Sequence, residues 1–204
     1  QKRNESIHDA YEAGHSSTSL SAALGFAMAR DLNKKKYNVI AVIGDGSIGN
    51  GLAYEALNHI GSLETPLIVI LNDNEMSISK NVGAINNMLD KIRSNFKYAK
   101  AKNHTKNIIK MIPIIGKPLN NFVSFTKDTL KKMYVKEGAL FEEFGFDYYG
   151  PINGHDFDEL ETYLEIAKKA DHPVLLHVIT EKGKGYVHAE NDKEGKWHGI
   201  SAFD

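Results

Sequence analysis

The sequence predicts an α/β fold in which a parallel β-sheet is flanked by helices. Two apolar runs, residues 37–43 and 67–71, enclose one helix-length segment, and each ends in a polar turn. A third apolar run, residues 174–179, follows another helix-length segment and ends in the glycine-containing turn TEKGKGY. Parallel strands joined by crossover helices end at the same edge of a sheet, where open α/β sheets bind ligands. We therefore expect the three turns to form one site.

The composition narrows the class of protein. A chain of 204 residues with 42 % hydrophobic and 25 % charged residues is ordinary for one globular domain or a tight pair. It contains no cysteine, which excludes disulfides, thiolate metal sites and a cysteine nucleophile and fits a reducing compartment. No apolar run approaches the roughly 18 residues needed to span a bilayer, and the N-terminus lacks the apolar core of a signal peptide. We expect a cytoplasmic protein that binds no membrane.

The first expected helix follows GHSST, residues 14–18, whose Ser and Thr residues suit N-capping. Its sequence, SLSAALGFAMARDL, repeats small and apolar residues at helical spacing, and its first amides are expected to be exposed near Ser16. The nearly unbroken apolar character of residues 37–43 then predicts a strand that is buried on both faces.

The next segment predicts a βαβ unit. Residues 44–51 form the turn, and residues 52–62 form a helix that carries the chain back to the buried strand 67–71. The residues expected along one face of this helix are Leu52, Glu55, Ala56 and His59. We assign His59 to packing or an interface rather than to chemistry.

Basic residues gather where the α/β pattern loosens, at about residues 80–137. Residues 91–136 carry twelve Lys or Arg against one Asp. AINNMLDKIRSNF and FVSFTKDTLKKMYV are patterned as amphipathic helices, whereas MIPIIGKPLNN is broken by Pro and Gly. We interpret this segment as a basic, partly mobile excursion from a single domain of residues 1–204. It is either a lid or anion-attracting surface, or a solvated helical face. Nucleic-acid binding is not expected, because no recognition motif accompanies the charge.

The α/β pattern returns after residue 140. Residues 144–149 suit a short strand, residues 157–170 a helix with Asp156 as its cap, and residues 174–179 a third buried strand. The glycines of TEKGKGY then place a third turn at the same edge, and the tail contains Trp197 and His198.

The turn GDGSIG, residues 44–49, matches G-x-G-x-x-G and raises the hypothesis of a dinucleotide-binding domain with Asp73 near the position of a ribose-binding acid. Against this hypothesis, Asp45 would repel phosphate charges at short range. A divalent cation held by Asp45 and the turn of residues 72–76 would reverse that repulsion. Magnesium suits a carboxylate, an amide oxygen, a backbone carbonyl and phosphate oxygens. Singly, these motifs are equally compatible with a plain tight turn and an Asx-rich loop.

Together, the motifs resemble a known signature. GDG followed by a helix, a strand and NDN is similar to the thiamin diphosphate motif of transketolase-like enzymes. More specifically, GHSSTS, VIGDG, EALNHIG, VILNDNEMSIS, VGA, LFEEFGFDYYGPINGHD and KGKGY resemble the first domain of the 1-deoxy-D-xylulose 5-phosphate synthase family, over residues 9–204. The resemblance implies a thiamin diphosphate-binding fold, of which this chain would be the diphosphate-binding domain.

The resemblance also implies roles for individual residues. The metal ligands, for Mg²⁺, would be Asp45, Asn74 and the backbone carbonyl of Met76. The cofactor-binding residues would be Gly14, His15, Ser16, Gly46, Ser47, Asn74 and Tyr186. The catalytic candidates would be His15 and His198, of which His198 matches a family histidine that faces the substrate. These roles agree with physical expectation, because glycine-turn amides and helix N-termini favour anions and a metal neutralises the remaining charge.

The reaction implied by the resemblance joins pyruvate and D-glyceraldehyde 3-phosphate to 1-deoxy-D-xylulose 5-phosphate, an isoprenoid precursor, with loss of CO₂. The cofactors would be thiamin diphosphate and Mg²⁺, and the assembly a homodimer. In the family, the glutamate that activates the cofactor's pyrimidine ring and the ligands of the substrate phosphate lie in a second, pyrimidine-binding domain. Neither that domain nor an upstream cofactor-binding segment is present in these 204 residues. We expect a piece of a longer protein that is inactive alone.

Three alternatives stay open. The chain is also compatible with the N-terminal half of a split transketolase, although NDNEMSIS and GPINGHD favour the synthase family. A nicotinamide dinucleotide-binding domain built on GDGSIG would bind its cofactor without a metal. A non-catalytic interaction module with a degenerate site would bind neither cofactor nor metal.

Overall fold

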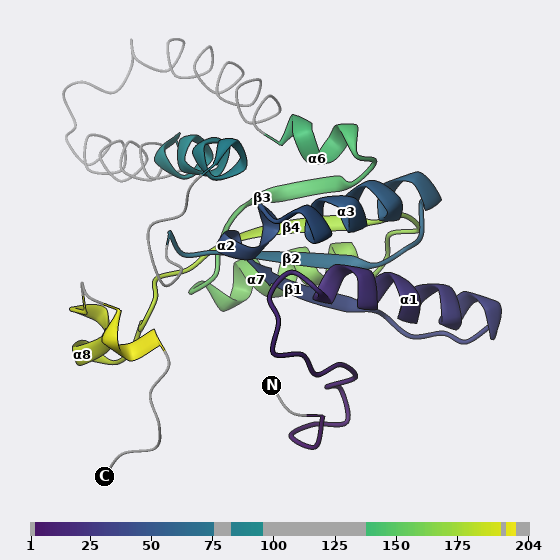
Figure 1. Cartoon of the computed structure of the whole chain (residues 1–204), viewed down its shortest axis with the longest axis horizontal. Coiled ribbons are helices and arrows are strands. Elements are labelled where there is room, and N and C mark those ends of the chain that lie inside the picture. Colours follow the sequence, from purple (N-terminus) through teal and green to yellow (C-terminus); the bar gives the residue numbers. More distant parts are fainter. Residues whose placement is uncertain (1–2, 76–82, 96–137, 193–194, 199–204) are drawn as a thin grey trace, which may run out of the picture.

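The computed structural model describes residues 3–75, 83–95, 138–192 and 195–198, and its elements follow the predicted α/β order (Figure 1). In chain order they are α1 (Ser19–Leu32), β1 (Ile40–Gly44), α2 (Asp45–Ile48), α3 (Gly51–Leu63), β2 (Ile68–Asp73), a helix over residues 84–95, α6 (Ala139–Glu143), β3 (Asp147–Asn153), α7 (Phe157–Ala167), β4 (Val174–Ile179), α8 (Val187–Glu190) and the 3₁₀-helix Lys196–His198.

The four strands form one parallel sheet in the order β1-β2-β4-β3. At its carboxyl end, Gly44 pairs with Asn72, Asn72 with Val178, and Asn153 with Ile179. The turns that follow all four strands therefore meet at one edge of the sheet. This confirms the predicted fold class and the predicted meeting of the strand-end turns.

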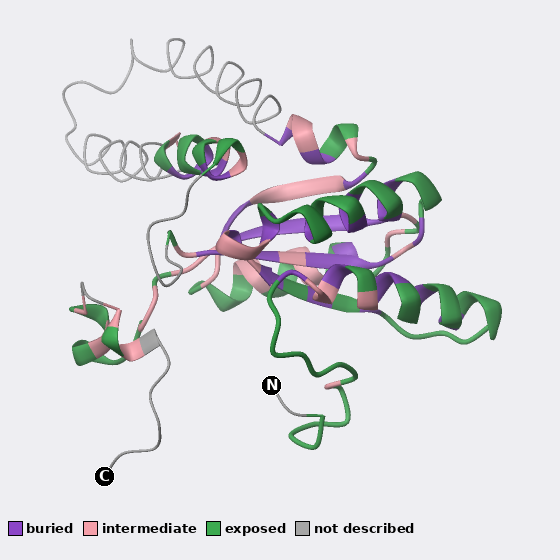
Figure 2. Ribbon diagram, in the orientation of Figure 1, coloured by how far each residue is buried: buried purple, intermediate pink, exposed green. Residues whose placement is uncertain are grey.

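Helices cover the two faces of the sheet to different extents. Helices α1, α3 and the helix over residues 84–95 contribute to a core on one face, and α7 packs on the other face over β3 and β4. Figure 2 shows the buried residues concentrated in the sheet and on the inner sides of these helices. None of the helices in the described part of the chain is long and apolar enough to cross a bilayer.

Strand β1 corrects the prediction that its residues are buried on both faces. Ala41 and Ile43 are buried, whereas Ile40 and Val42 are 48 % and 54 % exposed. The reason is that β1 lies at one edge of the sheet. On the face to which Ile40 and Val42 point, α7 packs near the other edge and does not cover β1. An apolar run therefore identified the strand but not its position in the sheet.

The two predicted helix caps have different outcomes. The Asp156 carboxylate accepts a hydrogen bond from the Glu159 amide at 3.1 Å, which confirms the cap of α7. Thr18 precedes α1 but makes no side-chain cap, because its backbone already has a helical conformation. Its hydroxyl donates instead to the carbonyl of His15 at 3.1 Å. The interaction stabilises the loop before α1 rather than the first amides of the helix.

Helix α3 lies against the chain segment between α6 and β3 at Gly61. A Cβ atom on Gly61 would lie 1.5 Å from the carbonyl oxygen of Phe144. Because the obstacle is backbone, Gly61→Ala is expected to destabilise the protein by about 2 kcal/mol or more. Gly51→Ala in the same helix is the matched control, because nothing lies within 4 Å of its Cβ position. Urea unfolding should show a large loss for the first variant only, and equal stabilities would contradict the close approach.

His172 connects the turn before β4 to the start of β3. Its imidazole nitrogens lie 2.7 Å from carboxylate oxygens of Asp147 and Asp171, and these hydrogen bonds raise the pKa of His172. Because the folded pKa exceeds the unfolded one, the stabilisation is fully present below about pH 6.5 while the carboxylates are ionised, and is lost as pH rises through the folded pKa. His172→Gln should remove this pH dependence from the melting temperature. Identical profiles for the two proteins would contradict the contact.

Candidate functional site

Asp45 joins the turns that follow β1 and β2. It begins the short helix α2, which occupies part of the turn predicted over residues 44–51, and it is 2 % exposed. One carboxylate oxygen accepts the Gly46 amide at 2.8 Å, and the other accepts the Glu75 amide at 2.9 Å. Because Glu75 directly follows Asn74, this second bond ties Asp45 to the predicted NDN turn.

The loop before α1 lies beside the same turn. His15 and Ser16 line a small cavity of about 170 Å³ together with Gly44 and Ser47. The Ser17 hydroxyl donates to the carbonyl of Ser47 at 2.8 Å, which fixes the loop to α2. The structure thus brings His15 and Ser16, which precede α1, close to Ser47, which follows β1.

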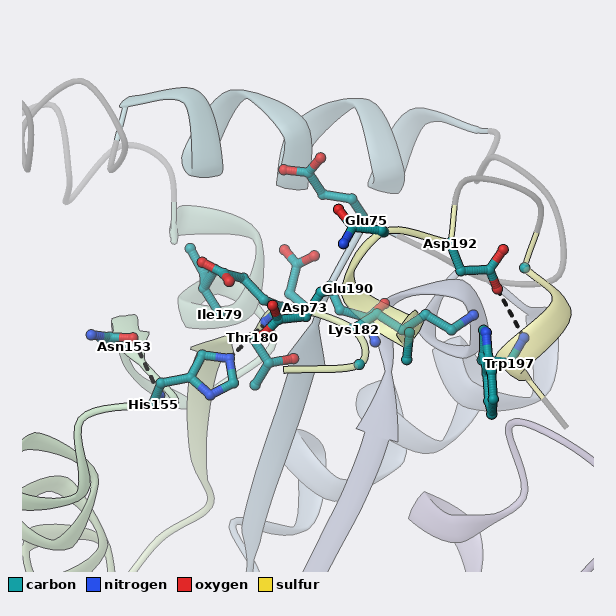
Figure 3. Close-up of a pocket in the computed structure, with 16 residues that line it drawn as sticks. Asp73, Glu75, Asn153, His155, Ile179, Thr180, Lys182, Glu190, Asp192 and Trp197 are labelled. Atoms are coloured by element: carbon teal, nitrogen blue, oxygen red, sulfur yellow. Dashed lines mark hydrogen bonds between the residues drawn. The ribbon is translucent and has the colours of Figure 1, made fainter. Parts of the chain in front are cut away.

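A larger cavity of about 830 Å³ opens at the ends of β2, β3 and β4 (Figure 3). Asn74 and Lys182 are among its lining residues. Figure 3 shows His155 on one side of the cavity and Trp197 on the other, close to Asp192. The Trp197 amide donates to the Asp192 carboxylate at 2.8 Å, so the tail itself forms part of the wall. The cavity is large enough for a small-molecule ligand.

The remaining predicted residues lie in the loop before α1, towards the tail or outside the described residues. Tyr186 is half-exposed and packs edge-on against Trp197, with ring centroids 5.1 Å apart. His198 ends the 3₁₀-helix, but its side chain is outside the described part of the chain. Met76 also lies outside the described residues. Gly14 is exposed in the loop before α1.

A buried polar network, absent from the sequence-based predictions, runs across the sheet next to Asp45. Asp73, at the end of β2, accepts a hydrogen bond from Arg93 and lies 2.8 Å from Nε2 of His177 on β4. Nδ1 of His177 lies 2.8 Å from the hydroxyl of Tyr148 on β3. Asp73 and His177 are completely buried, so their partners are other protein groups rather than solvent.

Comparisons with known proteins identify the family. Residues 1–180 match the profile described as 1-deoxy-D-xylulose-5-phosphate synthase. The chain belongs to this family. It is 55 % identical to the 1-deoxy-D-xylulose-5-phosphate synthase of Halalkalibacterium halodurans and 53 % identical to that of Geobacillus thermodenitrificans. Each match covers 99 % of this chain but 32 % of the relative, so the chain spans about a third of their length.

A solved structure supports the fold of this family member. The chain is similar to a transketolase from Campylobacter jejuni, with a TM-score of 0.50 and 24 % sequence identity over 82 % of this chain and 20 % of that one. At this identity the similarity concerns the fold alone. It agrees with the predicted α/β architecture.

The surroundings of Asp73 disfavour the alternative hypothesis of a nicotinamide dinucleotide-binding domain. A ribose-binding acid must present its carboxylate to the ligand. Asp73 instead has no exposed surface, and its two oxygens face Arg93 and His177. The residue that the alternative hypothesis needed for ribose is therefore structural.

The two neighbouring carboxylates have opposite pKa shifts. Burial raises the pKa of Asp45, and the nearby charge of Asp73 raises it further. Burial would also raise the pKa of Asp73, but its hydrogen bond with His177 and the charges of His177 and Arg93 outweigh that effect and lower the pKa. A bound cation at Asp45 would favour its ionised form. Asp73 already has its compensating partners.

The donor set at this edge fits a hard divalent cation. Within the described ranges, no group of three or more His, Cys, Asp or Glu is placed to hold a metal. The predicted Mg²⁺ site needs only one carboxylate, since an amide, a carbonyl and ligand oxygens supply the rest. Each Asp45 oxygen accepts one amide hydrogen bond, and the carboxylate also lies 3.7 Å from the guanidinium of Arg93. The described residues supply two of the predicted ligands, the Asp45 carboxylate and the Asn74 amide, and both are oxygen donors of the kind that Mg²⁺ prefers.

Sequence signals for the missed residues exist but are weak. His177 interrupts the apolar strand VLLHVI, and Arg93 lies four residues after Leu89 and one after Ile92, on the buried side of its helix. A polar residue at a buried position indicates a partner without saying which one. The predicted solvated or anion-attracting helical face does not apply to Arg93.

Proposed function

We propose that this chain is the metal- and diphosphate-binding part of a 1-deoxy-D-xylulose-5-phosphate synthase. The complete enzyme would condense pyruvate with D-glyceraldehyde 3-phosphate and release CO₂. The observation that carries the proposal is the buried Asp45 at the end of β1, bonded to the turn that contains Asn74. Family membership supports the same assignment, because the relatives that match 99 % of the chain carry this name.

The chain's own residues would bind and orient the cofactor. Asp45, Asn74 and the carbonyl of Met76 would hold Mg²⁺, and the backbone of Gly46 and Ser47 would approach the diphosphate. The glycine leaves room for this approach, and the α2 amides favour negative charge.

The other segments would enclose the rest of the cofactor and the substrate. The loop of Gly14, His15 and Ser16 lies beside α2 and would contact the cofactor from one side. Tyr186 would approach from the end of β4, and His198 would face the substrate. Thiamin diphosphate, when bound, supplies the electron sink for loss of CO₂ from pyruvate. The loop of residues 14–16, Tyr186 and His198 would position the cofactor and exclude water from it.

The remaining site would come from protein outside these 204 residues. The chain spans about a third of the length of its relatives. A pyrimidine-binding domain, a homodimeric assembly and a cytoplasmic location are further parts of this proposal. The chain alone is expected to be inactive.

The test is an activity assay on the protein expressed at the full length of its natural reading frame. We expect CO₂ release from pyruvate that requires D-glyceraldehyde 3-phosphate, thiamin diphosphate and Mg²⁺. The 204-residue chain serves as the inactive comparison. Ketol transfer from a ketose phosphate without CO₂ release would instead support a transketolase. Turnover coupled to a nicotinamide cofactor would contradict the proposal.

A further inference from the structure

Arg93 faces four carboxylates at the carboxyl edge of the sheet. Its guanidinium is bonded to Asp73 and to Asp90 of its own helix, and it lies 3.5 Å from Glu75 and 3.7 Å from Asp45. The residue is 5 % exposed. A buried arginine at this place puts a permanent positive charge beside the carboxylate that is predicted to bind metal.

The position of this charge is fixed by packing. Leu89 and Ile92, on the same helix, are buried in the core formed with α1 and α3. This helix, over residues 84–95, is the unlabelled teal helix in Figure 1. Because these side chains anchor the helix, Arg93 is held against the ends of β1 and β2 rather than moving freely in solvent.

Arg93 interacts differently with the two carboxylates Asp73 and Asp45. Asp73 is neutralised by direct bonds to Arg93 and His177. Asp45 is farther from the guanidinium, at 3.7 Å, and its oxygens accept backbone amides. Asp45 therefore has no direct bond to Arg93, but any cation bound to its carboxylate would lie within a few ångströms of an existing positive charge.

We propose that Arg93 is a positioning residue that serves as a built-in counter-cation of the Asp45 metal site and keeps the affinity of that site for Mg²⁺ alone low. A divalent cation next to Arg93 is repelled, whereas a diphosphate adds the negative charge that offsets the repulsion. Metal and diphosphate therefore bind together rather than in independent steps. This inference rests on the proposed function, since it concerns the metal site that the function requires.

The test measures binding of Mg²⁺ alone by calorimetry, and then in the presence of thiamin diphosphate, on the full-length protein. Arg93→Gln removes the charge and keeps a hydrogen-bond donor for Asp73. We expect it to bind Mg²⁺ alone about tenfold more tightly, because a unit charge within a few ångströms of a divalent ion has an effect of that size even in a water-like dielectric. The gain in Mg²⁺ affinity that thiamin diphosphate produces should shrink accordingly.

Two control variants show whether the charge of Arg93 or its packing determines the affinity for Mg²⁺. Arg93→Lys keeps the charge and should retain the wild-type affinity for Mg²⁺ alone. Arg30→Gln removes another buried arginine, which is paired with Asp31 at the far end of α1, and should also leave the affinity unchanged. If Arg93→Lys tightens Mg²⁺ binding as much as Arg93→Gln, the effect is not one of charge and the inference is wrong.

A second comparison covers the case in which Arg93→Gln does not fold. Asp73→Asn removes the partner's buried charge, so the pair Asp73→Asn and Asp73→Asn/Arg93→Gln differs only by the arginine charge. The double variant should again bind Mg²⁺ alone about tenfold more tightly than the single one. Equal affinities would overturn the inference. Absence of Mg²⁺-dependent thiamin diphosphate binding in the wild type would instead contradict the proposed function itself.

Discussion

Asp45→Asn is expected to weaken Mg²⁺-dependent binding of thiamin diphosphate by more than about 100-fold, because it removes the charged metal ligand. The fold should remain largely intact, since the asparagine oxygen still accepts the Glu75 amide that Asp45 accepts at 2.9 Å and only the bond from the Gly46 amide is lost. Calorimetric titration with thiamin diphosphate, with Mg²⁺ and with EDTA, measures the first effect. Thermal unfolding measures the second.

Asp156→Asn is the matched control for this variant. Asp156 also accepts a backbone amide, that of Glu159, but caps α7 and has no predicted role in metal binding. Asparagine caps helices about as well as aspartate, so both stability and cofactor affinity should persist. Wild-type affinity in Asp45→Asn, or an equal loss in Asp156→Asn, would refute the assignment of Asp45.

Asp73→Ala is expected to destabilise the protein by about 3–5 kcal/mol, the cost of breaking a buried ion pair by removing one partner. The variant would remove the completely buried carboxylate that both Arg93 and His177 contact, while Arg93 would keep its bond to Asp90. Total stabilities are about 5–15 kcal/mol, so this loss is large enough to unfold a substantial fraction of the protein. Urea unfolding measures this loss of stability, and the dependence of the unfolding free energy on urea concentration should be the same in both proteins.

Asp31→Ala is the exposed counterpart of this substitution. Asp31 pairs with Arg30 at 2.7 Å, as Asp73 pairs with Arg93, but the side chain of Asp31 is half-exposed. Exposed ion pairs contribute about 1 kcal/mol or less, so the control should cost little. Comparable losses in the two variants would show that burial is not what makes the Asp73 network important.

The order of the elements was predictable because it depends on local pattern. Apolar runs and glycine turns placed β2, β4 and α3 within a few residues of their observed bounds. Asp156 was correctly predicted as a cap from its position before α7. The meeting of Asp45 with the NDN turn also followed, because parallel strands must end at one edge.

The errors concern features that depend on distant residues. The exposed face of β1 results from its edge position, which the strand's own sequence does not encode. The face of α3 was predicted only in part: Ala56 is buried, but its buried neighbours are Ala53, Leu57 and Ile60, whereas His59 is exposed. Asp73 lies 104 residues from His177 and 20 from Arg93, so no local spacing could predict their network.

The most direct test of the account is calorimetric titration of the full-length protein with thiamin diphosphate in the presence and absence of Mg²⁺. We predict saturable binding that requires Mg²⁺ and is abolished by EDTA, because the edge formed by Asp45 and the NDN turn presents a carboxylate to the anionic diphosphate. Binding of thiamin diphosphate that persists in EDTA, or binding of NADH without any binding of thiamin diphosphate, would contradict the metal-bridged site.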